Sequence, residues 1–188
     1  MAGSRELFQR AYKLSDLGKF EEAEACYREV LKLDPTYSMA WNNLGWILFD
    51  QKDIVDEAEL CYKNALRYDP NNYIALNNLG IIYYRRKKDY HGAEKLWKKV
   101  VKINPYFMES WKNLSVLYKF QIVNLKRSQE CEKKANDIIA MQAKKSNLQN
   151  KDPKIEEKLN ICIECGNRLE PEQIICDKCG GSSKNSSN

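Results

Sequence analysis

Histidine is almost missing from this chain of 188 residues, and the one present is His91. No serine or cysteine nucleophile and no cluster of carboxylates accompanies it, so it has no visible catalytic role. The sequence also lacks a glycine-rich phosphate loop, a dinucleotide-binding fingerprint and a nucleophile elbow. These absences argue against catalysis, and we predict that the chain is not an enzyme.

Long apolar runs are missing as well. No run reaches the roughly 18 residues that a membrane-spanning helix needs. The first ten residues, MAGSRELFQR, carry charge and run straight into an amphipathic pattern, unlike a secretory signal. We therefore expect a cytoplasmic protein without a membrane partner, in a compartment where cysteines stay reduced.

Cysteine, in contrast, is concentrated near the C-terminus in two Cys-x2-Cys pairs with ten residues between them. The four residues are Cys162, Cys165, Cys176 and Cys179. Four thiolates can hold one tetrahedral Zn²⁺ at about 2.3 Å per bond, and they leave no open position for water. We expect one structural zinc ion. Iron of the rubredoxin type, a redox-active dithiol pair and two disulfides remain alternatives for this spacing.

The segment around these cysteines, residues 161–180, resembles the short zinc-ribbon family, in which two such pairs sit on small hairpins. It contains few large apolar side chains, so apolar burial alone could not fold it. Zinc binding must then contribute to its folding, on the order of 10 kcal/mol. We place the zinc ribbon at residues 160–181, a polar linker before it at 146–159 and a disordered tail after it at 182–188.

The rest of the chain is a repeat with a period of 35 residues. Pro35, Pro70 and Pro105 each follow an Asp or Asn. An alanine stands twelve residues before each proline and an aromatic residue eight before it: Ala23, Ala58 and Ala93, with Tyr27, Tyr62 and Trp97. A phrase of the form Trp/Leu-x2-Leu-Gly/Ser starts at residues 41, 76 and 111. A period of this size indicates stacked units that share one continuous core.

These positions resemble the tetratricopeptide repeat family over residues 4–145. The resemblance implies an all-α helical solenoid of three full repeats and a degenerate fourth repeat that caps it. The expected helix pairs are 4–17 and 20–33, 37–50 and 55–68, 72–87 and 90–103, and 107–121 and 125–145. The family period is 34 residues, so repeats two and three carry one extra residue. We place it between their helices, around 51–54 and 86–89.

Simple packing arguments explain the pattern. Alanine and glycine belong where two antiparallel helices cross closely, because a larger side chain would force the helices apart, and the aromatics fill the space beside them. Proline ends the second helix of a repeat, since the residue before it disfavours the helical region. In the last helix, the polar sequence leaves a thin apolar stripe at Ala135, Ile138, Ile139 and Gln142, as is typical of a terminal capping helix.

In the family that this chain resembles, the first helix of each repeat lines a concave groove in which extended peptides dock. The resemblance places these residues in the groove: Asn42, Asn43, Trp46, Phe49, Asn77, Asn78, Ile81, Tyr84 and Asn113. A carboxamide both donates and accepts, so a column of asparagines could hold a peptide backbone without reading its sequence. Such a column could equally bridge neighbouring helices, and the sequence leaves both interpretations open.

Charge is unevenly spread along the chain. Residues 1–70 contain 9 basic and 13 acidic side chains, whereas residues 71–150 contain 16 and 6, including the run Arg85-Arg86-Lys87-Lys88. We predict a non-catalytic adaptor that binds a protein segment in the repeat groove, with the zinc ribbon as a second contact surface. The alternative is a nucleic-acid-associated accessory factor that uses the ribbon and the basic repeats. An accessory subunit of an enzyme also remains open.

Overall fold

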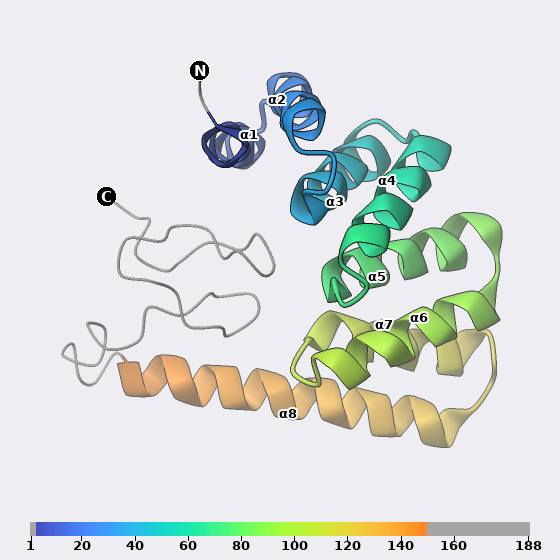
Figure 1. Cartoon of the computed structure of the whole chain (residues 1–188). Coiled ribbons are helices and arrows are strands. Elements are labelled where there is room, and N and C mark those ends of the chain that lie inside the picture. The colour runs from blue at the N-terminus through green and yellow to red at the C-terminus, as the bar shows by residue number, and fades with distance from the viewer. Residues whose placement is uncertain (1–2, 150–188) are drawn as a thin grey trace. The chain divides into compact units, whose positions relative to one another are not determined.

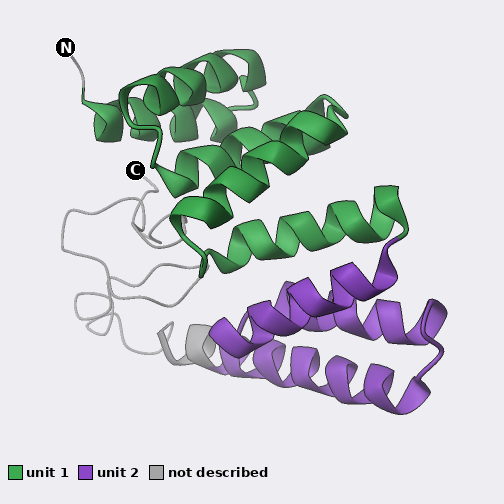
Figure 2. Ribbon diagram, turned by 45° about the vertical axis from the view of Figure 1, so that its right-hand side comes forward, with its two compact units in different colours: residues 1–88 green, residues 89–188 purple. Residues whose placement is uncertain are grey.

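The computed structural model describes residues 3–149, and the chain divides into two compact units, residues 1–88 and 89–188 (Figure 2). Every regular element in residues 3–149 is helical (Figure 1). Unit 1 contains α1 (Ser4–Asp16), α2 (Phe20–Leu33), α3 (Ser38–Trp46), η1 (Ile47–Gln51), α4 (Val55–Tyr68), α5 (Tyr73–Ile82) and η2 (Tyr83–Lys87). Unit 2 contains α6 (Tyr90–Ile103), α7 (Met108–Phe120) and α8 (Leu125–Gln149). Within that range, no helix is both long and apolar enough to cross a bilayer.

The helices of unit 1 pack in chain order. α1 packs on α2 and α3 on α4, which confirms the first two predicted pairs, while contacts of α2 with α3 and of α4 with α5 join successive repeats. The second helices begin and end at the predicted residues. The predicted third pair, 72–87 with 90–103, falls on both sides of the boundary between the units.

Small residues do mark a close helix crossing in the second repeat. A Cβ atom added to Gly45 would lie 2.9 Å from Cε1 of Tyr62 and 3.2 Å from Cβ of Cys61. Tyr62 and Ala58 on α4 are almost completely buried. The aromatic ring therefore covers the space that the glycine leaves, and α3 could not approach α4 this closely with a larger residue at position 45.

The extra residue of the 35-residue period is not in a loop, as predicted, but inside the first helix of the repeat. The last turns of the helices that begin as α3 and α5 are π-helical, η1 and η2, and a π turn accommodates one more residue than an α turn. A residue with positive φ follows, Asp53 or Lys88, where repeat one has Gly18. The inserted residue therefore widens the last turn of the first helix. The connection to the second helix stays the same as in repeat one.

The Asp-Pro phrase forms the turn between repeats. The Asp34 carboxylate accepts a hydrogen bond from the backbone N–H of Thr36 at 2.9 Å, and Asp69 does the same for Asn71 at 3.0 Å. The Tyr37 N–H also donates to the Asp34 carbonyl at 3.2 Å. Each second helix thus ends two residues before its proline. The aspartate side chain thus accepts a hydrogen bond from the backbone N–H of the residue after the proline, in a turn where the proline itself supplies no N–H.

In unit 2, α7 packs against both α6 and α8. Ser115 replaces the repeat glycine, and Ser128 on α8 replaces the repeat alanine. Their hydroxyls lie 3.2 Å apart, and the Ser128 hydroxyl donates to the Ser115 carbonyl at 3.0 Å. The fourth repeat therefore keeps the close crossing but satisfies two buried polar side chains there.

The apolar stripe of α8 differs from the predicted one. Its buried residues are Ser128, Cys131, Ala135 and Ile138, whereas Ile139 is 41% exposed and Gln142 is also exposed. Residue 139 is rotated by about 100° from residue 138 on a helix, so it leaves the contact face. α8 continues to Gln149, four residues beyond the predicted end, and thus covers the start of the predicted linker. The predicted zinc ribbon and tail lie outside the described residues.

An ion-paired glutamate follows each repeat alanine, a pattern that sequence reasoning missed. Glu24 pairs with Lys52 at 2.7 Å and with Arg28 at 2.8 Å. Glu59 pairs with Lys87 at 2.7 Å and with Lys63 at 2.8 Å. In each case one cation lies one turn along the same helix and the other lies at the end of the next repeat's first helix, so the glutamate joins two repeats. In unit 2, the corresponding residue is Glu94, which pairs with Lys98 at 2.6 Å and accepts from Tyr118 at 2.7 Å.

Candidate functional site

The predicted asparagine column forms a continuous hydrogen-bonded chain in unit 1. The Asn77 amide donates to Asn78 at 3.3 Å, and Asn78 donates to Asn42 on α3, in the preceding repeat, at 3.3 Å. Asn42 donates to Asn43 at 3.1 Å, and Asn43 donates to the Tyr27 hydroxyl at 3.1 Å. The column therefore links α5, α3 and α2 by hydrogen bonds. These asparagines do bridge neighbouring helices, as one of the two interpretations of the sequence predicted. Peptide binding by the same residues remains a prediction.

Burial leaves the four asparagines of the column with unequal access to a ligand. Asn42 and Asn77 are buried, whereas Asn43 and Asn78 are half-buried. Asn78 donates one N–H to Asn42 and accepts one hydrogen bond from Asn77. Asn43 keeps one N–H and one carbonyl lone pair, because its internal bonds use one of each. Asn43 and Asn78, the two half-buried amides of the column, therefore each retain the capacity to pair with both sides of a peptide bond.

The outward residues of α3 and α5 form two matching rows. Positions i, i+3 and i+7 lie on one side of a helix, and on each helix they carry an amide, an apolar residue and a charge. The six residues, here named the α3–α5 face, are Asn43, Trp46, Asp50, Asn78, Ile81 and Arg85. None of them is fully buried. Asp50 and Arg85 occupy equivalent positions in successive repeats and have opposite charges.

The aromatic residues of the predicted groove have different environments. Trp46 is half-buried and packs edge-on against Phe20 with ring centroids 5.8 Å apart. Phe49 is 7% exposed, and the guanidinium of Arg86 lies 5.8 Å from its ring centroid. The Phe49 ring is therefore covered by Arg86 and leaves little apolar surface for a partner side chain to contact. Tyr84 is half-buried on η2, and Asn113 is half-buried on α7 in unit 2.

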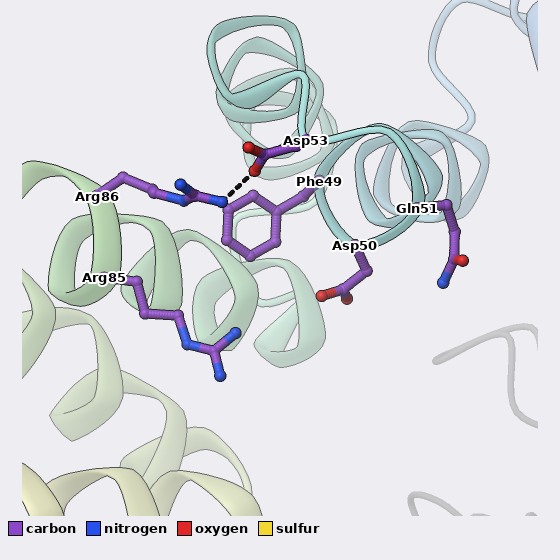
Figure 3. A pocket seen from close by; sticks show the side chains of 6 residues that line it. All are labelled: Phe49, Asp50, Gln51, Asp53, Arg85 and Arg86. Atoms are coloured by element: carbon purple, nitrogen blue, oxygen red, sulfur yellow. Dashed lines mark hydrogen bonds and ion pairs between the residues drawn. The ribbon is translucent and has the colours of Figure 1, made fainter.

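A hollow of about 500 Å³ lies at the charged end of the α3–α5 face (Figure 3). Its lining residues all belong to unit 1: Phe49, Asp50, Gln51, Asp53, Arg85 and Arg86. Arg86 is ion-paired with Asp53, while Arg85 and Asp50 project beside the hollow from different helices. Burial raises the pKa of the Asp50 carboxyl, and the charge of Arg85 and the hydrogen bond from Trp46 oppose that shift. Sequence reasoning singled out Phe49 and the basic run but did not place the two aspartates beside them.

The basic run 85–88 is not a free patch of positive charge. Arg86 pairs with Asp53, and Lys87 pairs with the buried Glu59. Two of its four charges are therefore matched by carboxylates of the preceding repeat. A phosphate backbone would have to compete with these partners, which weakens the nucleic-acid alternative.

The cysteines in the described residues are packing residues. Cys61 and Cys131 are buried, and Cys26 is half-buried. Burial raises the pKa of the Cys61 thiol to about 12 and that of Cys131 to about 11, so both stay protonated and unreactive at neutral pH. The four cysteines predicted to bind zinc lie outside the described residues.

Comparison with known proteins agrees with this architecture. Residues 8–63 match one tetratricopeptide-repeat family model and residues 61–95 match another, so this part of the chain consists of tetratricopeptide repeats. No curated protein sequence matches the chain.

Solved structures show the same fold. A crystal structure of MamA has a TM-score of 0.66 and 20% identity, over 75% of this chain and 81% of that chain. MamA 41-end from Desulfovibrio magneticus RS-1 has a TM-score of 0.62 and 22% identity, over 74% of this chain and 77% of that chain. At this level of identity the likeness concerns the fold alone.

Proposed function

We propose that this chain is a non-catalytic adaptor that holds an extended segment of a partner protein on the α3–α5 face. Tetratricopeptide repeats generally mediate protein–protein interaction, which supports an adaptor but does not identify the binding surface. The observation that carries the proposal is the pair of matching rows on α3 and α5. Each row offers an amide, an apolar side chain and a charge within two helical turns.

These three groups suit an extended peptide. The remaining N–H and lone pair of Asn43 can bond to one peptide unit of a partner. Trp46 and Ile81 are apolar and incompletely buried, so a partner side chain that covers them gains apolar contact. The internal amide chain fixes the orientation of Asn43 before binding, which reduces the entropy lost when a ligand is held.

We further propose that Cys162, Cys165, Cys176 and Cys179 hold one structural zinc ion in a small ribbon that provides a second contact surface. Support comes from the spacing of the cysteines and from the small number of large apolar residues around them. We also propose a cytoplasmic location, since cysteines that bind a metal as thiolates must stay reduced.

Selection from a phage-displayed library of unstructured peptides tests the main proposal. We expect the intact chain to select binders, and Ile81→Lys to weaken those binders at least tenfold, because it places a charge where apolar contact is formed. The matched control is Leu60→Lys, which changes a 56% exposed apolar residue on α4 in the same unit. The selected peptides should bind the Leu60→Lys variant with an affinity within about twofold of that for the intact chain. A selection that yields no binder, or binders equally weakened by both changes, would overturn the proposal.

A further inference from the structure

Arg85 differs from Arg86 and Lys87 because its guanidinium has no fixed partner in the described part of the chain. Arg86 is held by Asp53 and Lys87 by Glu59. Arg85 interacts electrostatically with Asp50, but no hydrogen bond or ion pair joins it to any residue within 3–149. An arginine carries five N–H donors in a planar fork, so most of its binding capacity remains available.

Arg85 lines an open hollow on the surface of unit 1. The ring of Phe49, 7% exposed, is covered by the guanidinium of Arg86, which Asp53 holds in place. These three residues form one wall, and Arg85 and Asp50 lie beside it (Figure 3). The volume of about 500 Å³ lies within the range of small-ligand pockets, roughly 300–1,000 Å³. It therefore has room for a side chain together with part of its backbone.

The charges of the hollow select among anions. Its lining contains two aspartates and two arginines, so its formal net charge is zero. A phosphate group with almost two negative charges would be repelled by both aspartates. A single carboxylate needs one guanidinium, with which it forms two parallel hydrogen bonds, and Arg85 is the group that is free to do so.

We propose that Arg85 receives a glutamate or aspartate side chain of the bound segment, so that the hollow fixes the position of one acidic residue in the partner. This inference rests on the proposed function, because the hollow lies at the end of the α3–α5 face. Asn43 and the apolar residues then hold the segment without reading its sequence. Arg85 supplies the selective contact and sets the register of the segment on the face.

Positional peptide libraries test the inference. Nonapeptides with blocked ends carry a fixed central residue, either Glu, Gln, Lys or phosphoserine, and random residues elsewhere. We expect the intact chain to bind the Glu library at least fivefold more tightly than the Gln library. Arg85→Gln should abolish this preference. Arg67→Gln is the matched control, because it removes an exposed arginine of α4 in the same unit, and it should leave the preference intact.

A charge reversal makes the test independent of any loss of stability. In Arg85→Glu the preference should switch from the Glu library to the Lys library, which a misfolded variant could not produce. Equal binding of the Glu and Gln libraries would overturn the inference while leaving the proposed function standing. Tighter binding of the phosphoserine library would overturn the choice of a carboxylate. Failure of all four libraries to bind would remove the proposed function and this inference together.

Discussion

Replacement of Glu59 by glutamine tests whether the ion-paired glutamates join the repeats. Its side chain is 7% exposed, and it forms ion pairs with Lys63 and Lys87, which are 53% and 43% exposed. Glutamine keeps the shape but loses the charge. The two lysines can return to water, so the cost is the lost charged hydrogen bonds and not two stranded charges. We expect the free energy of unfolding to fall by about 2 kcal/mol, less than the sum of two such bonds.

The two partners of Glu59 should contribute unequally. The pair with Lys63 lies within one helix, where such pairs contribute about 0.3–0.5 kcal/mol. The pair with Lys87 joins successive repeats. Urea unfolding of Glu59→Gln, Lys87→Met and the double variant gives the coupling energy directly. We expect about 1 kcal/mol for Lys87 and half that or less for Lys63.

Glu29→Gln is the matched control, because Glu29 and its partner Lys32 on α2 are 55% and 70% exposed. It should change the free energy of unfolding by less than about 0.5 kcal/mol.

The ion pairs of Glu59 also predict a pH dependence of stability. Burial opposes the shift, but bonds from the lysines lower the pKa of Glu59 below 4.5, its ordinary value. A carboxyl with a lowered folded-state pKa stabilises above its unfolded pKa and loses that contribution as pH falls through the folded pKa. The difference between Glu59→Gln and the parent chain should therefore shrink as pH falls below about 4.5. Equal stability of the two at pH 7, or a difference that grows in acid, would refute the argument.

Three further predictions concern other parts of the chain. Gly45→Leu should destabilise by at least about 1–3 kcal/mol through its clash with Tyr62, whereas Ala25→Leu on the exposed face of α2 should change stability little; equal melting of the two variants would contradict the close crossing. Elemental analysis should find one zinc per chain, lost in Cys176→Ser with helical circular dichroism nearly unchanged, and finding iron would contradict the assignment. The intact chain should not bind generic RNA or DNA with sub-micromolar affinity at physiological salt; such binding, lost when the run 85–88 is neutralised, would favour the nucleic-acid alternative.

The sequence predicted the helices well because the repeat fixes many positions at once. A period of 35 residues, small residues at the crossing and the Asp-Pro turn all identify the same register, so the second helices begin and end as expected. The extra residue was located less well. Sequence spacing shows that a residue has been inserted, but a loop and a π turn give the same spacing. The structure places it in η1 and η2, inside the helix end.

Side-chain partners were predicted less well than backbone elements, and the reason is geometric. Lys87 and Glu59 are 28 residues apart, and neither position looks unusual alone. Their pairing becomes visible when Glu24, Glu59 and Glu94 are compared at the same repeat position, because the period converts a distant contact into a recurring one. A search for repeated charges, as well as repeated apolar residues, could have found it.

The asparagines show why a repeated residue need not have one repeated role. Asn43 and Asn78 occupy equivalent positions, but Asn43 donates to the Tyr27 hydroxyl and Asn78 donates to Asn42. Asn78 has Asn42 of the preceding repeat as its acceptor, whereas the position equivalent to Asn42 in repeat one is Phe8, whose side chain accepts no hydrogen bond. The first asparagine of the column therefore bonds to a tyrosine where the next one bonds to an amide. The start of the repeat array, and not the repeat alone, decides which partner an equivalent amide has.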